Sequence, residues 1–126
     1  MEFIKFKKEG KIAIISLNRP EVHNAINLGM IKELTQALKE CEGDDIKVVL
    51  LRGEGKSFSS GADIKQFMEF ASGKGNLIEY GTHLHFGVIK KMRELPKPII
   101  AEVKGYAIGA GLGCLLYTSP SPRDRG

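Results

Sequence analysis

VVLLRGEGKSFSSGADIK, residues 48–65, is the stretch from which the fold can be read. Residues 48–51 form a continuous apolar run, which predicts a buried strand. Glycines and charged residues at 52–55 end that strand, and residues 56–61 are predicted to form a loop. Asp63 then predicts the start of a short helix, because its carboxylate can accept a hydrogen bond from a backbone N–H of the first turn. Strand, loop and helix in this order indicate an α/β domain.

Two strand patterns precede this stretch. Residues 3–8 and 11–17 are rich in β-branched and aromatic residues, and Glu9-Gly10 between them predicts a hairpin turn. The second pattern contains the nearly continuous apolar run Ile12-Ala13-Ile14-Ile15, which predicts burial on both faces. Asn18-Arg19-Pro20 ends it, because proline lacks a backbone N–H and restrains the residue before it.

Helical spacing lies on both sides of the central stretch. Apolar residues recur at helical intervals over residues 27–42 and again over residues 77–95. Another apolar stretch, residues 98–103, predicts a third buried strand and leads into a glycine-rich turn at residues 105–113. Strands that alternate with helices predict one layered α/β domain.

Composition and charge narrow the function classes. The 126 residues allow one domain or an incomplete piece of a larger one, with 42% hydrophobic and 27% charged residues, as in ordinary globular proteins. The net charge of +4 is spread along the chain, and the densest basic run, Lys90, Lys91 and Arg93, lies in a predicted helix. This pattern favours a solvated surface or contact with a few phosphates, so we expect no nucleic-acid partner.

The location of the protein is predicted from its apolar runs and its cysteines. No apolar run approaches the roughly 18 residues that a membrane-spanning helix needs, and no signal-peptide pattern begins the chain. Cys41 and Cys114 lie far apart without a CxxC spacing, which predicts free thiols in a reducing compartment. We therefore expect a cytoplasmic protein without membrane contact, with an organelle matrix as the other possibility.

Glycine-rich and histidine motifs exclude several kinds of site. Gly55-Lys56-Ser57 resembles the end of a phosphate-binding P-loop, but that motif requires glycine where Leu50 stands. Gly109-Ala110-Gly111-Leu112-Gly113 follows a predicted strand, but Cys114 occupies the place of the third glycine of a dinucleotide-binding fingerprint. His83 and His85 are two positions apart on a predicted helix and so face different ways, and no metal site is expected.

Three other motifs follow one another along the chain: residues 18–26, NRPEVHNAI; residues 59–65, SSGADIK; and residues 105–111, GYAIGAG. Their order and separation resemble those of the crotonase family of enoyl-CoA hydratases and isomerases. The resemblance covers residues 1–113. It implies the ClpP/crotonase-like spiral of ββα units, of which this chain would hold a truncated N-terminal part. It also implies an acyl-CoA substrate, with coenzyme A as part of the substrate rather than a cofactor, and a homotrimer or hexamer.

The same resemblance implies an oxyanion hole. Reactions beside a thioester carbonyl place negative charge on its oxygen, and two backbone N–H groups at helix starts can bind that oxygen. Ala62 and Ala110 stand at the positions whose N–H groups form this oxyanion hole in the family. The second position is often glycine in family members. The residues implied to contact coenzyme A are Val22, His23, Ala25, Ser60, Gly61, Asp63, Ile64 and Lys65. Three of these residues and the turn glycine Gly109 also have structural alternatives: Gly61 and Gly109 as loop glycines, Asp63 as a helix cap and Lys65 as a solvated lysine.

The acid and base of the family's hydratases are missing. The first glutamate would stand at Gly113, and the second would lie beyond Gly126. A native Gly113 would indicate an isomerase or another non-hydratase subgroup. Residues 114–126 contain two prolines where a helix is expected, and we interpret them as an atypical tail, disordered or foreign to the domain. Hence we expect an inactive chain of a thioester-processing protein that stabilises an enolate; a non-catalytic coenzyme A thioester-binding module is the alternative.

Overall fold

The computed structural model describes residues 1–73, 75–106 and 119–120. The chain begins with an antiparallel hairpin of β1 (Ile4–Glu9) and β2 (Ile12–Leu17), in which Ile4 lies opposite Leu17. Gly10 makes the turn with a φ of 58°, a backbone conformation that glycine adopts without steric penalty. The predicted hairpin is confirmed.

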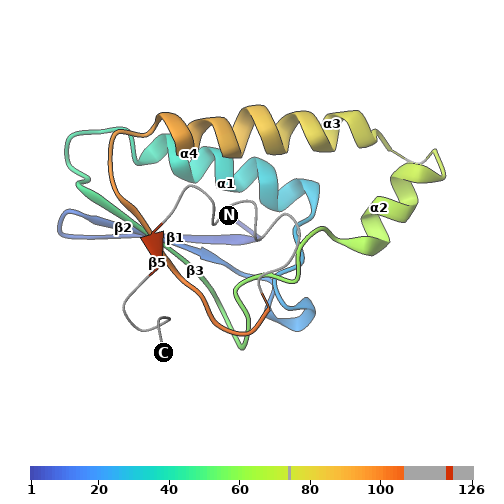
Figure 1. The fold of residues 1–126 in the computed structure, drawn as a ribbon, viewed down its shortest axis with the longest axis horizontal. Coiled ribbons are helices and arrows are strands. Elements are labelled where there is room, and N and C mark those ends of the chain that lie inside the picture. Colours follow the sequence, from blue (N-terminus) through green and yellow to red (C-terminus); the bar gives the residue numbers. More distant parts are fainter. Residues whose placement is uncertain (74, 107–118, 121–126) are drawn as a thin grey trace.

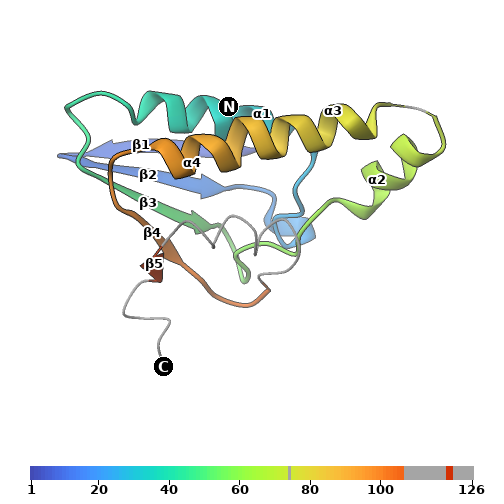
Figure 2. The same cartoon turned by 45° about the horizontal axis from the view of Figure 1, so that its top comes forward.

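A single sheet carries all the described strands, in the order β1-β2-β3-β4-β5 (Figures 1 and 2). β3 (Val48–Gly53), β4 (Ile99–Glu102) and β5 (Ser119–Pro120) each pair in parallel with the preceding strand of that order. The connections from β2 to β3 and from β3 to β4 contain helices, as is usual between parallel neighbours. The predicted central strand and third buried strand are therefore confirmed.

Helices cover one face of this sheet. α1 (Leu28–Glu40) lies beside a second, long helical segment formed by α3 (Leu77–Thr82), the π-helical turns η2 (His83–Ile89) and α4 (Lys90–Glu94) (Figures 1 and 2). The predicted helix over residues 77–95 is confirmed as a helical segment, but its central third is π-helical, which apolar spacing alone did not indicate.

Two short helices lie outside this layer. The 3₁₀ turn η1 (Pro20–Val22) follows β2, and α2 (Ile64–Ala71) projects at one end of the molecule (Figure 1). α2 buries none of its residues, although its sequence is amphipathic. Both elements border the loops described below.

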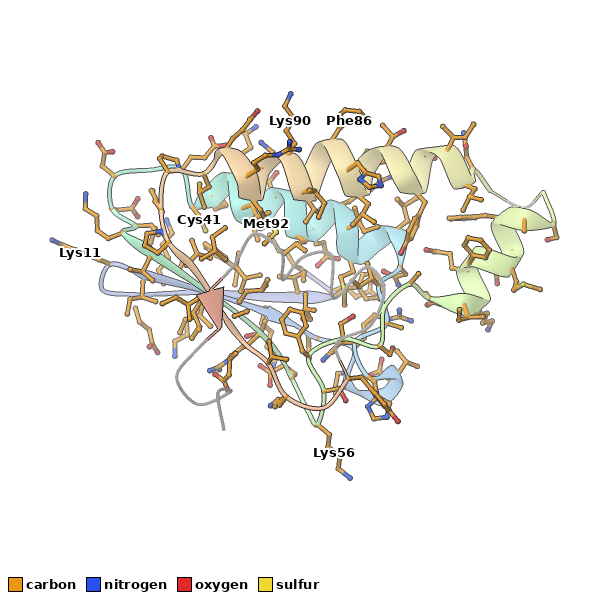
Figure 3. All side chains as sticks on the ribbon, in the orientation of Figure 1. Lys11, Cys41, Lys56, Phe86, Lys90 and Met92 are labelled. Atoms are coloured by element: carbon orange, nitrogen blue, oxygen red, sulfur yellow. The ribbon has the colours of Figure 1, made fainter. Side chains whose placement is uncertain are left out.

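The core lies between the helices and the sheet, where Figure 3 places Cys41 and Met92. Alternate strand residues point into it and are at most 5% exposed: Ile4, Ala13, Ile15, Leu17, Val49, Leu51, Ile99 and Ala101. Phe86 and Lys90, in contrast, point away from the sheet on the outer side of the long helical segment (Figure 3).

The prediction that residues 12–15 are buried on both faces is wrong in part. Ala13 and Ile15 are buried, but Ile12 is 43% exposed and Ile14 is half-buried. Leu50 and Ile100, which are in register with Ile14 on the same face, are half-buried as well. The reason is that the described helices pack against only the other face of the sheet.

The proposed atypical tail and the second oxyanion position fall largely outside the described residues. Of residues 114–126, only Ser119 and Pro120 are described, and they pair with Ile100 and Ala101. Ala110 also lies outside the described residues. The domain boundary at residue 113 stays a prediction.

Candidate functional site

The loops that follow β2, β3 and β4 meet at one edge of the sheet, because the carboxyl ends of parallel strands lie side by side. The loop after β3 runs between the other two. Its Phe58 and Ser59 amides donate to the carbonyls of Lys104 and Tyr106, at 2.7 and 2.8 Å. On the opposite side, the Ser60 amide donates to the His23 carbonyl at 2.8 Å. These contacts bring together the first two motifs and the first two residues, 105 and 106, of the third motif, whose other residues lie outside the described part of the chain.

Ala62 lies in a short parallel bridge with Ile26. The Ile26 amide donates to the Gly61 carbonyl at 2.7 Å, and the Asp63 amide donates to the Ile26 carbonyl at 3.0 Å. This pattern turns the N–H and C=O of Ala62 away from Ile26. Within the described part of the chain, no acceptor binds the Ala62 N–H. Gly61 has a φ of 95°, a conformation suited to glycine, which aims the following amide.

Asp63 connects α2 to the loop after β2. One carboxylate oxygen accepts from the Gln66 amide at 3.1 Å and caps the helix, which confirms the predicted capping role. The other oxygen pairs with the Arg19 guanidinium at 2.9 Å, and both side chains are only about 15% exposed. The same guanidinium nitrogen donates to the Ala25 carbonyl at 2.7 Å.

The charge state of Asp63 follows from these contacts. Burial by itself would raise the pKa of the carboxyl, but the hydrogen bond from Gln66 and the interaction with Arg19 together lower it from its ordinary value. Asp63 is therefore a carboxylate at neutral pH, and the Arg19 cation balances its charge beside the Ala62 amide. No local sequence pattern indicates this pair, because 44 positions separate its members.

The buried side chain of Asn24 joins the loop after β2 to the loop after β3. Its side chain is fully buried; the amide oxygen accepts from the Arg19 backbone at 2.8 Å, and the amide nitrogen donates to the carbonyls of Glu54 and Ser57. His23 and Asn24 both have positive φ, of 51° and 55°. A fully hydrogen-bonded amide can hold such a strained backbone in place.

The residues implied to contact coenzyme A fall into two groups around Ala62. Val22, His23 and Ser60 lie on one side, where the Ser60 hydroxyl donates to the Val22 carbonyl at 3.2 Å. The exposed His23 ring lies 3.0 Å from the Ser57 hydroxyl and packs edge-on against Tyr106, with ring centroids 5.1 Å apart.

On the other side, Ile64 and Lys65 begin α2, and both are exposed. The carbonyl of Ala25, the residue before Ile26, accepts a hydrogen bond from the Arg19 guanidinium.

Two features near Ala62 were missed by the sequence analysis. Ile64, Phe67 and Met68 form an exposed apolar face on α2, with 71%, 43% and 63% of their surface accessible. Tyr80 reaches from α3 to donate its hydroxyl to the Ile26 carbonyl at 2.7 Å. Asp63 predicted a helix here but not the exposure of its apolar residues, and nothing in the sequence connects Tyr80 with Ile26, 54 positions away.

The described residues contain neither a metal-binding cluster nor a membrane-spanning helix. Among the described residues, no group of three or more His, Cys, Asp or Glu side chains is arranged to hold a metal ion. None of the described helices combines the length and apolar character needed to cross a bilayer.

Comparison with known proteins gives a consistent result. A family model described as enoyl-CoA hydratase/isomerase matches residues 7–119. The chain is similar to a short-chain-enoyl-CoA hydratase from Clostridium acetobutylicum, with 39% identity over 107 residues, which cover 83% of this chain and 40% of that protein. It is also similar to a probable enoyl-CoA hydratase from Bacillus subtilis, with 36% identity over 118 residues, which cover 89% and 43% of the two chains.

The fold comparison agrees. The crystal structure of an enoyl-CoA hydratase/carnithine racemase from Magnetospirillum magneticum matches with a TM-score of 0.77 and 38% identity, and covers 89% of this chain and 42% of that one. The chain spans less than half the length of these relatives. The fold is that of crotonases, and the described residues of the motifs that predicted the family meet at one edge of its sheet. The chain belongs to the enoyl-CoA hydratase/isomerase, or crotonase, family.

Proposed function

We propose that the protein to which this chain belongs processes acyl-coenzyme A thioesters, as an enoyl-CoA hydratase or isomerase. In this proposal the backbone N–H groups of Ala62 and Ala110 bind the thioester oxygen and stabilise an enolate. The observation that carries the proposal is the Ala62 amide, which has no acceptor in the described part of the chain and follows a glycine with a φ of 95°. Loss of one such donor typically raises the reaction barrier by roughly 2.7–4 kcal/mol.

Arg19 has an electrostatic role in this proposal. A carboxylate next to the oxyanion donor would by itself repel the negative charge that develops on the thioester oxygen. The 2.9 Å pairing of Asp63 with Arg19 balances that charge, so that Asp63 caps α2 without opposing the reaction. The first turn of α2 then adds the favourable end of its helix dipole.

The remainder of the ligand is assigned to the two groups around Ala62. The coenzyme A moiety passes Val22, His23, Ala25 and Ser60, with Gly61, Asp63 and Ile64 beside the thioester, and the exposed ammonium of Lys65 reaches a phosphate. The acyl chain lies along the apolar face of Ile64, Phe67 and Met68, which is exposed without it. No separate cofactor or metal enters the mechanism.

General acid and base groups would come from outside residues 1–126. They contribute roughly 10²–10⁴-fold to such reactions, and Gly113 stands at the position where family hydratases have glutamate. We therefore propose that this chain binds the thioester without turning it over at the rate of a complete enzyme. If native, the same glycine favours an isomerase or another non-hydratase subgroup. The second candidate function is a non-catalytic coenzyme A thioester-binding module. A longer reading frame that encodes a downstream Asp or Glu would support the enzyme. A stop codon directly after Gly126 would support the binding module.

We further propose a homotrimer or hexamer for the whole protein, located in the cytoplasm or in an organelle matrix. Family membership supports the assembly, and the buried free thiol of Cys41 is compatible with a reducing compartment. The assembly is tested by analytical ultracentrifugation of the protein expressed from the longest available reading frame, which gives its mass in solution.

The oxyanion hole can be tested with crotonyl-CoA that carries carbon-13 at the thioester carbonyl. Binding is measured by calorimetry, and polarisation of the carbonyl by the shift of its infrared band. We expect the unsubstituted chain to shift the band to lower frequency. Ala62→Pro, which removes the N–H, should abolish the contribution of this donor, whereas Ala62→Gly, which keeps it, should retain the shift. Equal bands for the two folded variants would contradict the assignment of Ala62.

A further inference from the structure

We infer that Tyr80 is a positioning residue for the Ala62 amide, an inference that rests on the function proposed above. Its hydroxyl donates to the Ile26 carbonyl at 2.7 Å, and the same carbonyl accepts from the Asp63 amide at 3.0 Å. The carbonyl thus binds two donors, a side chain of α3 and the backbone amide just before α2. The hydrogen bond from Tyr80 therefore fixes the Ile26 carbonyl, which also binds the amide of Asp63, the residue directly after Ala62.

The bridge gives this contact its importance. Ala62 is held between two hydrogen bonds, from Ile26 to Gly61 and from Asp63 to Ile26. A shift of the Ile26 carbonyl therefore changes the direction of the Ala62 N–H. Tyr80 is only 9% exposed, so its ring is fixed by packing and its hydroxyl is shielded from solvent. In such surroundings a hydrogen bond is geometrically restrictive.

Tyr80 also contacts α2. The Phe70 ring packs edge-on against the Tyr80 ring, with centroids 6.2 Å apart. α2 has a second contact close to the bridge: the Gln66 side chain accepts a hydrogen bond from the amide of Leu28, two residues after Ile26, at 2.6 Å. These contacts join the bridge to α2, which carries the apolar face proposed for the acyl chain. Tyr80 contacts both Phe70 of α2 and Ile26 of the bridge.

This role differs from substrate contact. A buried hydroxyl that binds a backbone carbonyl orients the oxyanion donor but does not itself touch the thioester. Its loss should change the polarisation of the carbonyl more than the affinity for the ligand, because an oxyanion donor acts mainly on developing charge. In a longer, active form of the protein, kcat should fall and KM should change little.

The test compares Tyr80→Phe with Thr35→Val in the full 126-residue chain. Each substitution removes one hydroxyl that donates to a backbone carbonyl, and the Thr35 bond, to Ile31 at 2.9 Å, lies within α1. Exchange of the Asp63 amide is measured by NMR relative to the α1 amides, which report global opening. For Tyr80→Phe we expect Asp63 to exchange about three- to tenfold faster, as for one lost hydrogen bond, and for Thr35→Val no selective change.

The labelled crotonyl-CoA gives the second measurement. Tyr80→Phe should move the carbonyl band back towards that of the free ligand while the Kd stays within about threefold. Thr35→Val should leave the band in place. Site-specific 3-fluorotyrosine at position 80, a stronger donor of similar shape, should slow Asp63 exchange, and it tests the inference even where the phenylalanine variant fails to fold.

The possible failures can be told apart. Unchanged Asp63 exchange in both Tyr80 variants would overturn the inference, as would an unchanged carbonyl band in Tyr80→Phe. A missing band shift in the unsubstituted chain would instead contradict the proposed oxyanion hole, and the exchange measurement would still decide whether Tyr80 holds the bridge.

Discussion

Arg19 and Asp63 form the best-shielded ion pair among the described residues, and its energetics can be tested by charge removal. Asp63→Asn keeps the shape of the cap but leaves the Arg19 guanidinium partly buried without a counter-charge. We expect the free energy of unfolding to fall by about 1–3 kcal/mol. Denaturant unfolding at pH 7 measures this loss. Asp45→Asn is the matched control, because Asp45 pairs with Lys8 on the exposed surface; it should have little effect.

The pH dependence of the same pair has a definite sign. The pKa of Asp63 is lowered in the folded chain, so the folded state binds a proton less readily than the unfolded state. The stabilisation is therefore present above the unfolded pKa of about 3.9 and is lost as the pH falls through the lowered value. The stability difference between the unsubstituted chain and Asp63→Asn should shrink from pH 6 to pH 3. A constant difference would show that the charge of Asp63 is not what stabilises the fold.

The pKa of Cys41 is shifted in the direction opposite to that of Asp63. Burial raises the pKa of its thiol to about 11, and its Sγ donates to the Ala37 carbonyl at 3.3 Å. Because the folded state holds this proton more tightly, its stabilising effect is present below the unfolded pKa of about 8.5 and is lost as the pH rises towards 11. We expect Cys41 to resist iodoacetamide at pH 8 in a Cys114→Ser background, as followed by mass spectrometry. Rapid alkylation of the native chain would contradict this burial.

At the scale of elements, the crossing of α1 and the long helical segment depends on Gly87. A Cβ at this position would lie 2.8 Å from the Thr35 hydroxyl oxygen. The π-helical turns of η2 surround this close approach. The two helices can therefore pack closely here only because the residue has no side chain.

Two glycine substitutions test this crossing. Gly87→Ala should destabilise the chain by about 1–3 kcal/mol, because overpacking outweighs the better helix propensity of alanine. Gly81→Ala is the control: a Cβ there meets nothing within 4 Å, and it should stabilise by about 0.5–1 kcal/mol. Thermal unfolding of both variants measures the difference. Stabilisation by both would mean that the close approach at Gly87 does not restrict packing.

At the scale of the whole molecule, local patterns predicted the elements but not how they meet. Glu9-Gly10 predicted the hairpin, and Asp63 predicted the start of α2, because turns and caps depend on neighbouring residues. The contacts of Arg19 with Asp63 and of Tyr80 with Ile26 join residues 44 and 54 positions apart, which no local spacing encodes. The exposure of Ile12 was missed because apolar periodicity does not report which face of a sheet the helices cover.

The one-sided packing of the sheet leads to a prediction with neighbouring leucines of β3. Leu51 faces the helices and is 2% exposed, whereas Leu50 faces the other way and is half-buried beside Ile14 and Ile100. Leu51→Ala should lower the free energy of unfolding by about 2–5 kcal/mol, because it leaves a cavity between sheet and helices. Leu50→Ala removes the same atoms from a face that none of the described helices covers and should have less than half that effect. Urea unfolding of the 126-residue chain measures both; equal losses would show that the second face is packed as tightly as the first. In a longer protein in which further chain covers that face, the effect of Leu50→Ala should rise towards that of Leu51→Ala, so the ratio of the two losses reports how much of the sheet is enclosed.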